Sequence, residues 1–473
     1  MTINISKWFD FNQAKETNEY EREPVPENKV KGFKSFVNLV AGEHIAGTEF
    51  VIGPLFVIHG VSAKDVFLGL LVGNILATLS WALVCAPAAV KTRITIFYQL
   101  EKICGYQITS VYNTVNAFLY AISAAAMIGV SASAIGILTG VEGPGLTSLY
   151  PTSFAWVVII GFVGLIIAIV ATFGFDSVSK FSSLFAPWMP FIFLSSALAM
   201  LPGLGFTSLE SFWEVANETI WTGVALAGET KYTFWHVMIF AWLCNNSMHI
   251  GLADMSIYRY AKKSTYGLAS GFGMFIGHYM AWIASGILCA LALQNGNSNP
   301  SPGQIAFLGA GFAGLLCVVI AGWTTANPTI YRAGLAVQAL LPKLPRWKVT
   351  LLVGVFATVI ACFPAVVSKL DQILGLYALV AAPVGAVVLI DIYLFPKVGM
   401  ISNLAESVGL KFNWVVALTW VLSMMVSYML YDYFEADFYF FMAIPGWIIA
   451  AMIYPLGAFL YQSYLRKRHI SHA

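Results

Sequence analysis

Long apolar runs recur along the chain, and short polar segments separate them. From Phe33 to Leu465 these runs reach roughly 18 residues or more, enough for a helix to cross about 30 Å of hydrocarbon. This pattern predicts an all-α polytopic membrane protein with twelve transmembrane helices. The predicted spans, numbered 1 to 12 in chain order, cover residues 33–59, 65–88, 108–140, 152–172, 181–202, 234–256, 265–293, 304–340, 349–366, 371–395, 413–431 and 438–463.

Basic residues orient the spans, because the cytoplasmic loops of membrane proteins carry an excess of Lys and Arg. With the N-terminal tail assigned to the cytoplasm, only Lys64, Lys231 and Lys369 of the 25 Lys and Arg residues fall in outside segments. An even number of spans places both termini on the same side. We therefore predict a multi-pass protein of the plasma (inner) membrane with both termini in the cytoplasm.

Composition supports this class and excludes others. The 473 residues are 59% hydrophobic and only 10% charged, with a mean hydropathy of +0.77, whereas a soluble surface needs far more charge. A net charge of +2 is too small to indicate nucleic-acid binding. The polar first 30 residues lack the apolar core of a signal peptide. The six cysteines lie mostly in apolar runs without a CxxC motif, which disfavours a disulfide framework or a zinc site.

Three spans carry polar residues where a lipid-facing helix would be apolar. These are residues 42–49 in span 1, residues 245–254 in span 6 and residues 322–328 in span 8. Gly, Pro and Asn release backbone groups from the helical ladder, which a membrane protein tolerates only around a protein-lined cavity. Ionisable residues at this depth cost at least about 2.5–3.5 kcal/mol each on insertion scales, so they usually have a partner or a function. We predict that all three helices are broken.

Spans 1 and 6 share a short pattern. An acid follows a histidine by five residues in both, as Glu49 after His44 and as Asp254 after His249. Five spans separate the copies, and an odd number inverts the second relative to the first. Broken helices at matching positions of inverted halves indicate a mid-membrane site in secondary transporters. The predicted organisation is a cytoplasmic tail (1–32), repeat 1 (33–203), an extracellular loop (204–233), repeat 2 (234–396), helices 11 and 12 (397–463) and a second cytoplasmic tail (464–473).

Three segments resemble the nucleobase:cation symporter 1 family, which includes cytosine, purine, hydantoin and allantoin permeases. They are AGWTTANPTIYRAGL in span 8, DMSIYRYAKK at the end of span 6 and VGNILATLSWAL in span 2. The resemblance implies a leucine-transporter-like fold, with a five-plus-five inverted repeat and spans 11 and 12 appended. It also implies alternating access driven by Na⁺ or H⁺.

The resemblance further implies a sodium site between spans 1 and 8. By position, its carbonyl ligands are those of Gly42, Ile45 and Ala321, and its hydroxyl ligands are those of Thr324 and Thr325. Na⁺ prefers hard oxygen ligands, and unwound carbonyls near half-helix ends supply them. Two alternatives stay open. The threonines could instead bond preceding carbonyls of their own helix. A proton could also replace sodium, carried by Glu43, His44, Glu49 or His249.

The predicted substrate pocket departs from the family. Members commonly place Gln and Trp on span 3, at positions near Ala124 and Met127 here, and the aromatic position of span 6 falls near Ser247. Stacking could instead come from Tyr120, Trp242 or Trp323. A carboxylate at Glu43 would suit a cationic or strongly donating group. The predicted substrate-binding residues are Glu43, His44, Asn116, Tyr120, Ala124, Met127, Asn246, Ser247, His249 and Asn327.

Structural roles compete with these functional ones. His44 and His249 could be buried histidines bonded to carbonyls, although their paired positions favour a function. Glu49 is assigned a structural role more readily than Glu43, because it can bond the free amides of the break. Asp254 lies near the cytoplasmic end, where we expect it to pair with Arg259.

The leading hypothesis is a cation-coupled symporter for a small nitrogenous solute, with a nucleobase or related heterocycle first. The alternative on the same scaffold is a cationic or zwitterionic amine, an amino acid or a vitamin precursor. An intramembrane enzyme is disfavoured because the chain has no HExxH motif and no long soluble loop. A channel is disfavoured because polarity is confined to a few spans. We expect a monomer in the bilayer that binds its substrate and Na⁺ or H⁺, with no other cofactor and no nucleic acid.

Overall fold

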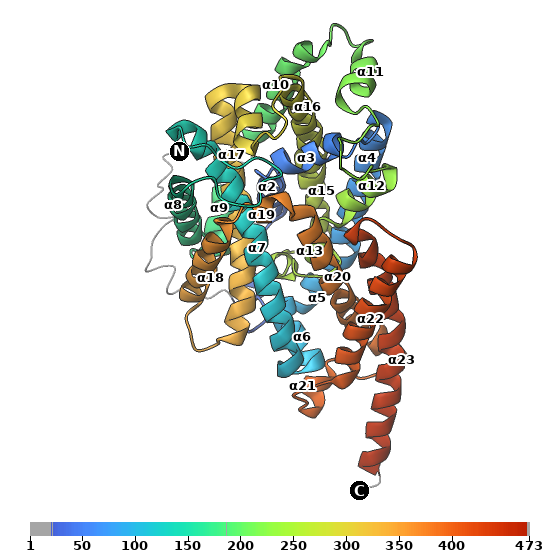
Figure 1. Cartoon of the computed structure of the whole chain (residues 1–473). Coiled ribbons are helices and arrows are strands. Elements are labelled where there is room, and N and C mark those ends of the chain that lie inside the picture. The colour runs from blue at the N-terminus through green and yellow to red at the C-terminus, as the bar shows by residue number, and fades with distance from the viewer. Residues whose placement is uncertain (1–19, 21, 186, 471–473) are drawn as a thin grey trace.

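The computed structural model describes residues 20, 22–185 and 187–470, and the regular elements of this part of the chain are all helices, without a β-strand. Figure 1 shows a bundle of long helices, with α7 near its centre and α22 and α23 together at one side. The principal helices are α2 Phe33–His44, α3 Glu49–Ile58, α4 Ala63–Ser80, α5 Ala86–Thr92, α6 Ile96–Cys104, α7 Tyr106–Thr139, α8 Phe154–Ala171, α9 Phe175–Phe185, α10 Met189–Met200, α12 Phe234–Leu243, α13 Asn246–His249, α14 Met255–Tyr258, α16 Met280–Gln294, α17 Pro302–Leu340, α18 Arg346–Ala361, α20 Leu370–Leu389, α22 Trp414–Tyr433 and α23 Ala443–Ile470.

Nine helical segments in the described part are long and apolar enough to cross a membrane, judged by length and composition. The other three predicted spans correspond to α2 with α3, to α12 through α14, and to the 16-residue α18. A count of twelve therefore stays a prediction. Helix α6, between spans 2 and 3, was not predicted. Its apolar residues Ile96, Phe97, Leu100 and Ile103 are buried at helical spacing.

Two of the three predicted breaks are present. In span 1, α2 ends at His44, Ile45 leaves the helical region (φ −98°, ψ 66°), and α3 begins at Glu49. In span 6, α12 ends at Leu243 and only short helical turns follow, with Leu252 in the left-handed region at φ 65°. Polar residues concentrated at these points predicted the breaks correctly.

The predicted break at residues 322–328 of span 8 is wrong. Helix α17 runs through this stretch with Pro328 inside it, and its non-helical residues are Ala310 and Gly311. Gly311 adopts φ 55°, which a residue without Cβ accepts at no steric cost. Proline removes one amide donor but is tolerated in a packed transmembrane helix. Here residues 324–336 are all buried.

Close helix packing depends on small residues at the contacts, as is typical of membrane bundles. A Cβ at Gly322 of α17 would lie 2.9 Å from the Met127 carbonyl of α7. A Cβ at Gly53 of α3 would overlap the Ser285 hydroxyl and the Trp282 carbonyl of α16. Helix α17 therefore packs closely on α7, and α3, which follows the break in span 1, packs closely on α16.

Gly53→Ala tests this packing. We expect it to destabilise the protein by about 1–3 kcal/mol, the usual cost of inserting a methyl group into a filled site. The measurement is the thermal unfolding midpoint of the purified protein in detergent. Gly161→Ala in α8 is the matched control, because a Cβ there meets nothing within 4 Å. Equal midpoints for the two variants would contradict the α3–α16 contact.

Candidate functional site

A cavity of about 60 Å³ lies where the two broken spans meet α7, α17 and α20. A space of this size holds a few waters, whereas pockets for drug-sized ligands measure roughly 300–1,000 Å³. The structure therefore represents a closed state around its centre. The lining residues are Glu43, His44, Ala46, Thr48, Glu49, Ile52, Tyr120, Ser123, Met127, Cys244, Asn245, Ser247, Met248, His278, Thr325, Thr329, Leu370, Leu374 and Tyr377.

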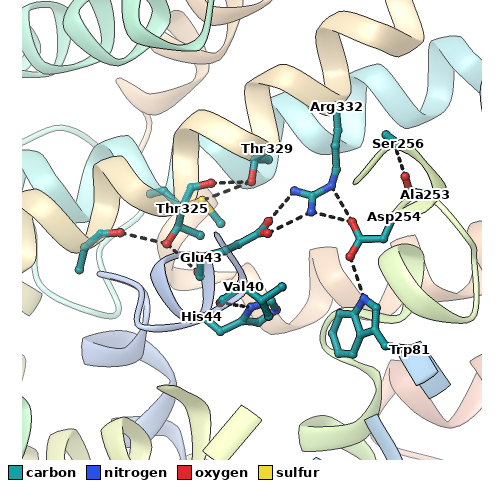
Figure 2. Close-up of polar contacts among 12 residues, drawn as sticks. Val40, Glu43, His44, Trp81, Ala253, Asp254, Ser256, Thr325, Thr329 and Arg332 are labelled. Atoms are coloured by element: carbon teal, nitrogen blue, oxygen red, sulfur yellow. Dashed lines mark hydrogen bonds and ion pairs between the residues drawn. The ribbon is translucent and has the colours of Figure 1, made fainter. Parts of the chain in front are cut away.

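A buried arginine binds two carboxylates beside this cavity (Figure 2). Arg332 of α17 donates through Nη1 to Glu43 Oε1 at 2.5 Å and through Nη2 to Glu43 Oε2 at 3.0 Å. Its Nε and Nη2 donate to Asp254 Oδ1 at 2.9 and 2.6 Å. The second Asp254 oxygen accepts from Trp81 Nε1 at 2.7 Å. These four residues, which we call the Arg332 cluster, join α17 to both broken spans and to span 2.

Two carboxylates against one guanidinium leave the Arg332 cluster with one uncompensated negative charge when all three groups are ionised. Glu43, Asp254 and Arg332 are each at most 3% exposed. Removing an ion from water costs several kcal/mol even after relaxation, and bidentate geometry recovers much of that cost. The remaining negative charge favours a cation nearby.

The expected pair of Asp254 with Arg259 is wrong, because Asp254 binds Arg332 instead. The left-handed turn at Leu252 precedes Asp254, whose carboxylate meets α17. Arg259 donates to the Ser256 and Tyr20 carbonyls and to the Tyr260 hydroxyl. Arg332 was not among the predicted site residues. Its position well inside the predicted span 304–340 was the available signal.

The structure brings part of the predicted ion site together. The Thr325 hydroxyl lies 2.8 Å from the Glu43 carbonyl oxygen of α2 and 2.9 Å from the Ala321 carbonyl oxygen. The Thr324 hydroxyl donates to the same Ala321 carbonyl at 3.0 Å. Gly42 belongs to the last turn of α2, and Ile45 follows its end. Oxygen atoms of α17 and of the span 1 break thus converge, with the carbonyl of Glu43 as an unpredicted member.

The two histidines of the repeat pattern have different surroundings. His44 Nδ1 lies 2.8 Å from the Val40 carbonyl, so this nitrogen carries the hydrogen in the neutral ring. Its Nε2 is then an acceptor, and it has no hydrogen-bond partner among the described residues. His249 is fully buried with its ring centroid 4.5 Å from that of Trp81, and it does not line the cavity. Of the two, only His44 faces the site.

Half of the predicted substrate-binding residues line the cavity, namely Glu43, His44, Tyr120, Met127 and Ser247. Asn116 instead accepts from the Tyr377 hydroxyl at 2.5 Å, and Asn246 donates to the Ala378 carbonyl at 3.2 Å. Ala124, His249 and Asn327 are buried outside the cavity lining.

Of the three aromatic residues expected to stack on the substrate, only Tyr120 lines the cavity. Tyr120 is present, and the unpredicted Tyr377 of α20 meets it edge to face at 5.4 Å. Trp242 instead donates to the Ser80 hydroxyl, and Trp323 stacks on Phe181 at 6.5 Å. Neither tryptophan lines the cavity. The phenol rings at the cavity wall are therefore those of Tyr120 and Tyr377.

A second polar group at the cavity was missed. His278 lies in the π-helical segment η7 Gly273–Tyr279, a conformation frequent at functional sites. Its Nε2 is 3.9 Å from Glu49 Oε1, and its ring stacks on Trp282 at 4.3 Å. Trp282 Nε1 donates to Glu49 Oε2. A histidine inside the apolar run 265–293 was the signal that could have found it.

A larger vestibule of about 390 Å³ lies on the side predicted to be extracellular. Ile52 and Leu370 line both spaces, so an apolar partition separates them. The vestibule wall includes His59, whose ring stacks on Tyr232 at 3.9 Å. Burial raises the pKa of the Tyr232 hydroxyl above its usual range, and the Asp371 carboxylate acts in the same direction. The cavity thus lies between this partition and the Arg332 cluster.

Comparison with known proteins supports the fold. No family model and no curated relative matches the chain. The structure is similar to Mhp1, a nucleobase-cation-symport-1 family transporter solved in a closed conformation with bromovinylhydantoin bound, at 15% identity and a TM-score of 0.68, over 92% of this chain and 94% of that one. It is also similar to a Na⁺-coupled sialic acid symporter in a substrate-bound, outward-open state, at 15% identity and a TM-score of 0.63, over 96% and 94%.

A manganese transporter of Eremococcus coleocola matches less well, at 14% identity and a TM-score of 0.50, over 90% of this chain and 92% of that one. At these identities the likeness concerns the fold. It confirms the predicted all-helical, leucine-transporter-like architecture.

Arg332→Gln tests the Arg332 cluster. Removing the guanidinium leaves two buried carboxylates without a counter-ion, so we expect a loss of about 3–5 kcal/mol in stability. The measurement is the thermal unfolding midpoint in detergent. The triple variant Glu43→Gln, Asp254→Asn, Arg332→Gln carries no ionised group at these positions and should recover much of the loss. A single variant as stable as the unaltered protein would contradict the ion pairs.

Proposed function

We propose that the protein is a secondary active transporter, a cation-coupled symporter that imports a small nitrogenous solute. A nucleobase or related heterocycle is the first candidate. The observation that carries the proposal is the closed cavity at the junction of two broken helices, with apolar and charged barriers on opposite sides. Substrate sites of secondary transporters lie at such junctions of discontinuous helices. The solved structures of similar fold are transporters, which also fits a protein that is not an enzyme.

The cavity wall supports a small planar ligand with N–H donors. His44 Nε2 offers an acceptor, and the Tyr120 and Tyr377 rings supply flat apolar surface. Bromovinylhydantoin, which is bound in one structure of similar fold, has a compact ring with such donors. For an amine substrate, Glu43 was the expected partner, but Arg332 binds both of its carboxylate oxygens. This contact removes the main support for that alternative.

Ion coupling is proposed at the α2–α17 contact. The backbone carbonyl oxygens of Glu43 and Ala321 and the hydroxyls of Thr324 and Thr325 gather there, and the side chain of Glu43 belongs to the Arg332 cluster. A cation bound at this point would hold the end of α2 against α17. Na⁺ fits the neutral oxygen donors, and the neighbour that transports sialic acid is Na⁺-coupled.

Alternating access follows from the same contacts. We propose that spans 1, 2, 6 and 7 move as a four-helix bundle against spans 3, 4, 8 and 9, within repeats bounded at 33–203 and 234–396. Ile52 and Leu370 would then part to admit substrate from the vestibule. Opening on the opposite side requires the bundle to move relative to Arg332. The distribution of basic residues supports a cytoplasmic location for both termini.

Uptake by a transporter-null host tests the substrate class. Cells expressing the protein should accumulate at least one radiolabelled compound from a panel of nucleobases, hydantoins and allantoin, and unlabelled heterocycles should compete. Amines, amino acids and vitamin precursors form the comparison panel. The heterocycle proposal fails if no heterocycle competes for uptake or raises the thermal stability of the purified protein.

Thr325→Ala tests the coupling site. We expect the variant to lose Na⁺ stimulation of uptake, because it lacks the hydroxyl at the α2–α17 contact, while expression stays normal. Uptake is measured with and without an inward Na⁺ gradient. Thr114→Ala is the matched control, since its hydroxyl makes the same bond to the carbonyl four residues earlier at an exposed position. Unchanged sodium dependence in Thr325→Ala would move the coupling ion to H⁺.

A further inference from the structure

Three carboxylates line the cavity or its inner barrier, and their charge environments differ. Glu43 and Asp254 share the guanidinium of Arg332. Glu49 is 1% exposed, and no Lys or Arg side chain forms an ion pair with it within the described part of the chain. An isolated buried carboxylate at this depth either acquires a counter-charge or takes up a proton.

The side chain facing Glu49 is a titratable base. His278 Nε2 lies 3.9 Å from Glu49 Oε1, and both residues line the cavity. Trp282 holds the two groups in place. The His278 ring stacks on it with an interplanar angle of 15°, and its indole Nε1 donates to Glu49 Oε2. A carboxylate and an imidazole that share one proton are electrically neutral together, whichever of them carries it.

A purely structural role accounts for only part of this arrangement. Glu49 Oε1 lies 3.4 Å from the Ala46 amide, so the carboxylate bonds a free backbone donor of the span 1 break. The Ala46 amide donates to Oε1 and the Trp282 indole donates to Oε2, so a structural role accounts for an acceptor at each carboxylate oxygen. It does not explain why His278, a base, faces Oε1.

Other charged groups near the pair are already bound or weakly basic. Helix α2 contributes His44, whose ring centroid is 5.1 Å from that of His278, and also Glu43. The end of α12 contributes Cys244, with Sγ 4.0 Å from His278 Nδ1. Helix α17 contributes Arg332, which Glu43 and Asp254 bind, and Asp254 also accepts from Trp81. Helix α16 contributes the neutral Trp282 and Ser285, and the latter bonds the Glu49 carbonyl at 2.6 Å.

The pair lies close to the vestibule on the predicted outer side. Glu49 and Ile52 lie three residues apart on α3, so they share a helix face. Ile52 borders the vestibule, whose wall includes the polar side chains of His59 and Asp371. Parting of the Ile52 and Leu370 partition would expose Glu49 to outside water.

We infer that Glu49 and His278 form a proton-binding site in the cavity wall, separate from the proposed Na⁺ position at Thr325. A proton from outside water binds the Glu49 carboxylate or His278 Nε2 and leaves to inside water after the cavity reopens. Resting on the proposed symport function, the site makes H⁺ a coupling ion of the transporter. The prediction is that the protonation of Glu49 changes with pH and that His278 affects the pH at which it changes.

Infrared difference spectroscopy of the ligand-free, full-length protein in detergent tests this inference. Spectra at acidic and alkaline pH should differ by the C=O band of a protonated carboxyl group. Labelling with ¹³C-glutamate should shift that band, which separates it from buried aspartates such as Asp391. Glu49→Gln should lose the band and Glu43→Gln should keep it. His278→Gln should move its pH midpoint, because the partner that shares the proton is gone.

A band that persists in Glu49→Gln, or a labelled protein without a pH-dependent glutamate band, would overturn the proton site. If Glu49→Gln does not fold, the isotope shift in the unaltered protein and the midpoint in His278→Gln decide the question. No substrate is used, so the result is independent of the uptake assays. Absent uptake with a Glu49 band intact would contradict the transport function and leave the proton site standing.

Discussion

The rest of the structure depends on how Arg332 is neutralised in the middle of the protein. A guanidinium at this depth is tolerated only with carboxylates in hydrogen-bonding geometry, and Glu43 and Asp254 supply them from two different broken helices. One contact therefore fixes the end of α2, the turn before α14 and the indole of Trp81 against α17. The cluster adjoins the cavity at Glu43, and when all three groups are ionised it carries one net negative charge near the oxygens proposed to bind sodium.

Successive side chains of span 1 contact the Arg332 cluster, the cavity and the vestibule in turn, as expected for a transport path. Glu43 is bound to Arg332, His44 faces the cavity, and Glu49 meets His278 at the start of α3. Ile52 then forms part of the apolar partition to the vestibule. The helix break allows these side chains to point into one small space, since a continuous helix would spread them around its circumference. The site is therefore a consequence of the break and of the neighbours that hold it.

Much of this organisation was predictable from the sequence. Polar residues inside apolar runs identified the breaks in spans 1 and 6, and the family resemblance placed Thr325 beside the first of them. Span 8 was not predictable in the same way, because α17 stays helical around Pro328 in a fully buried stretch. The partner of Asp254 depended on tertiary structure, and Arg259 was merely nearer in sequence. His278 and Tyr377 went unnoticed because single polar residues in apolar runs give no hint of which cavity they face.

Accumulation by the purified protein in sealed proteoliposomes tests the central claim most directly. A labelled heterocycle from the host panel would be supplied outside, with an inward Na⁺ gradient, an inward H⁺ gradient or neither. The account predicts uptake above the equilibrium level with an ion gradient and its collapse when an ionophore dissipates that gradient. Equilibration to the same level under all three conditions would show that no cation is coupled, and it would contradict the assignment of the cavity to a symporter.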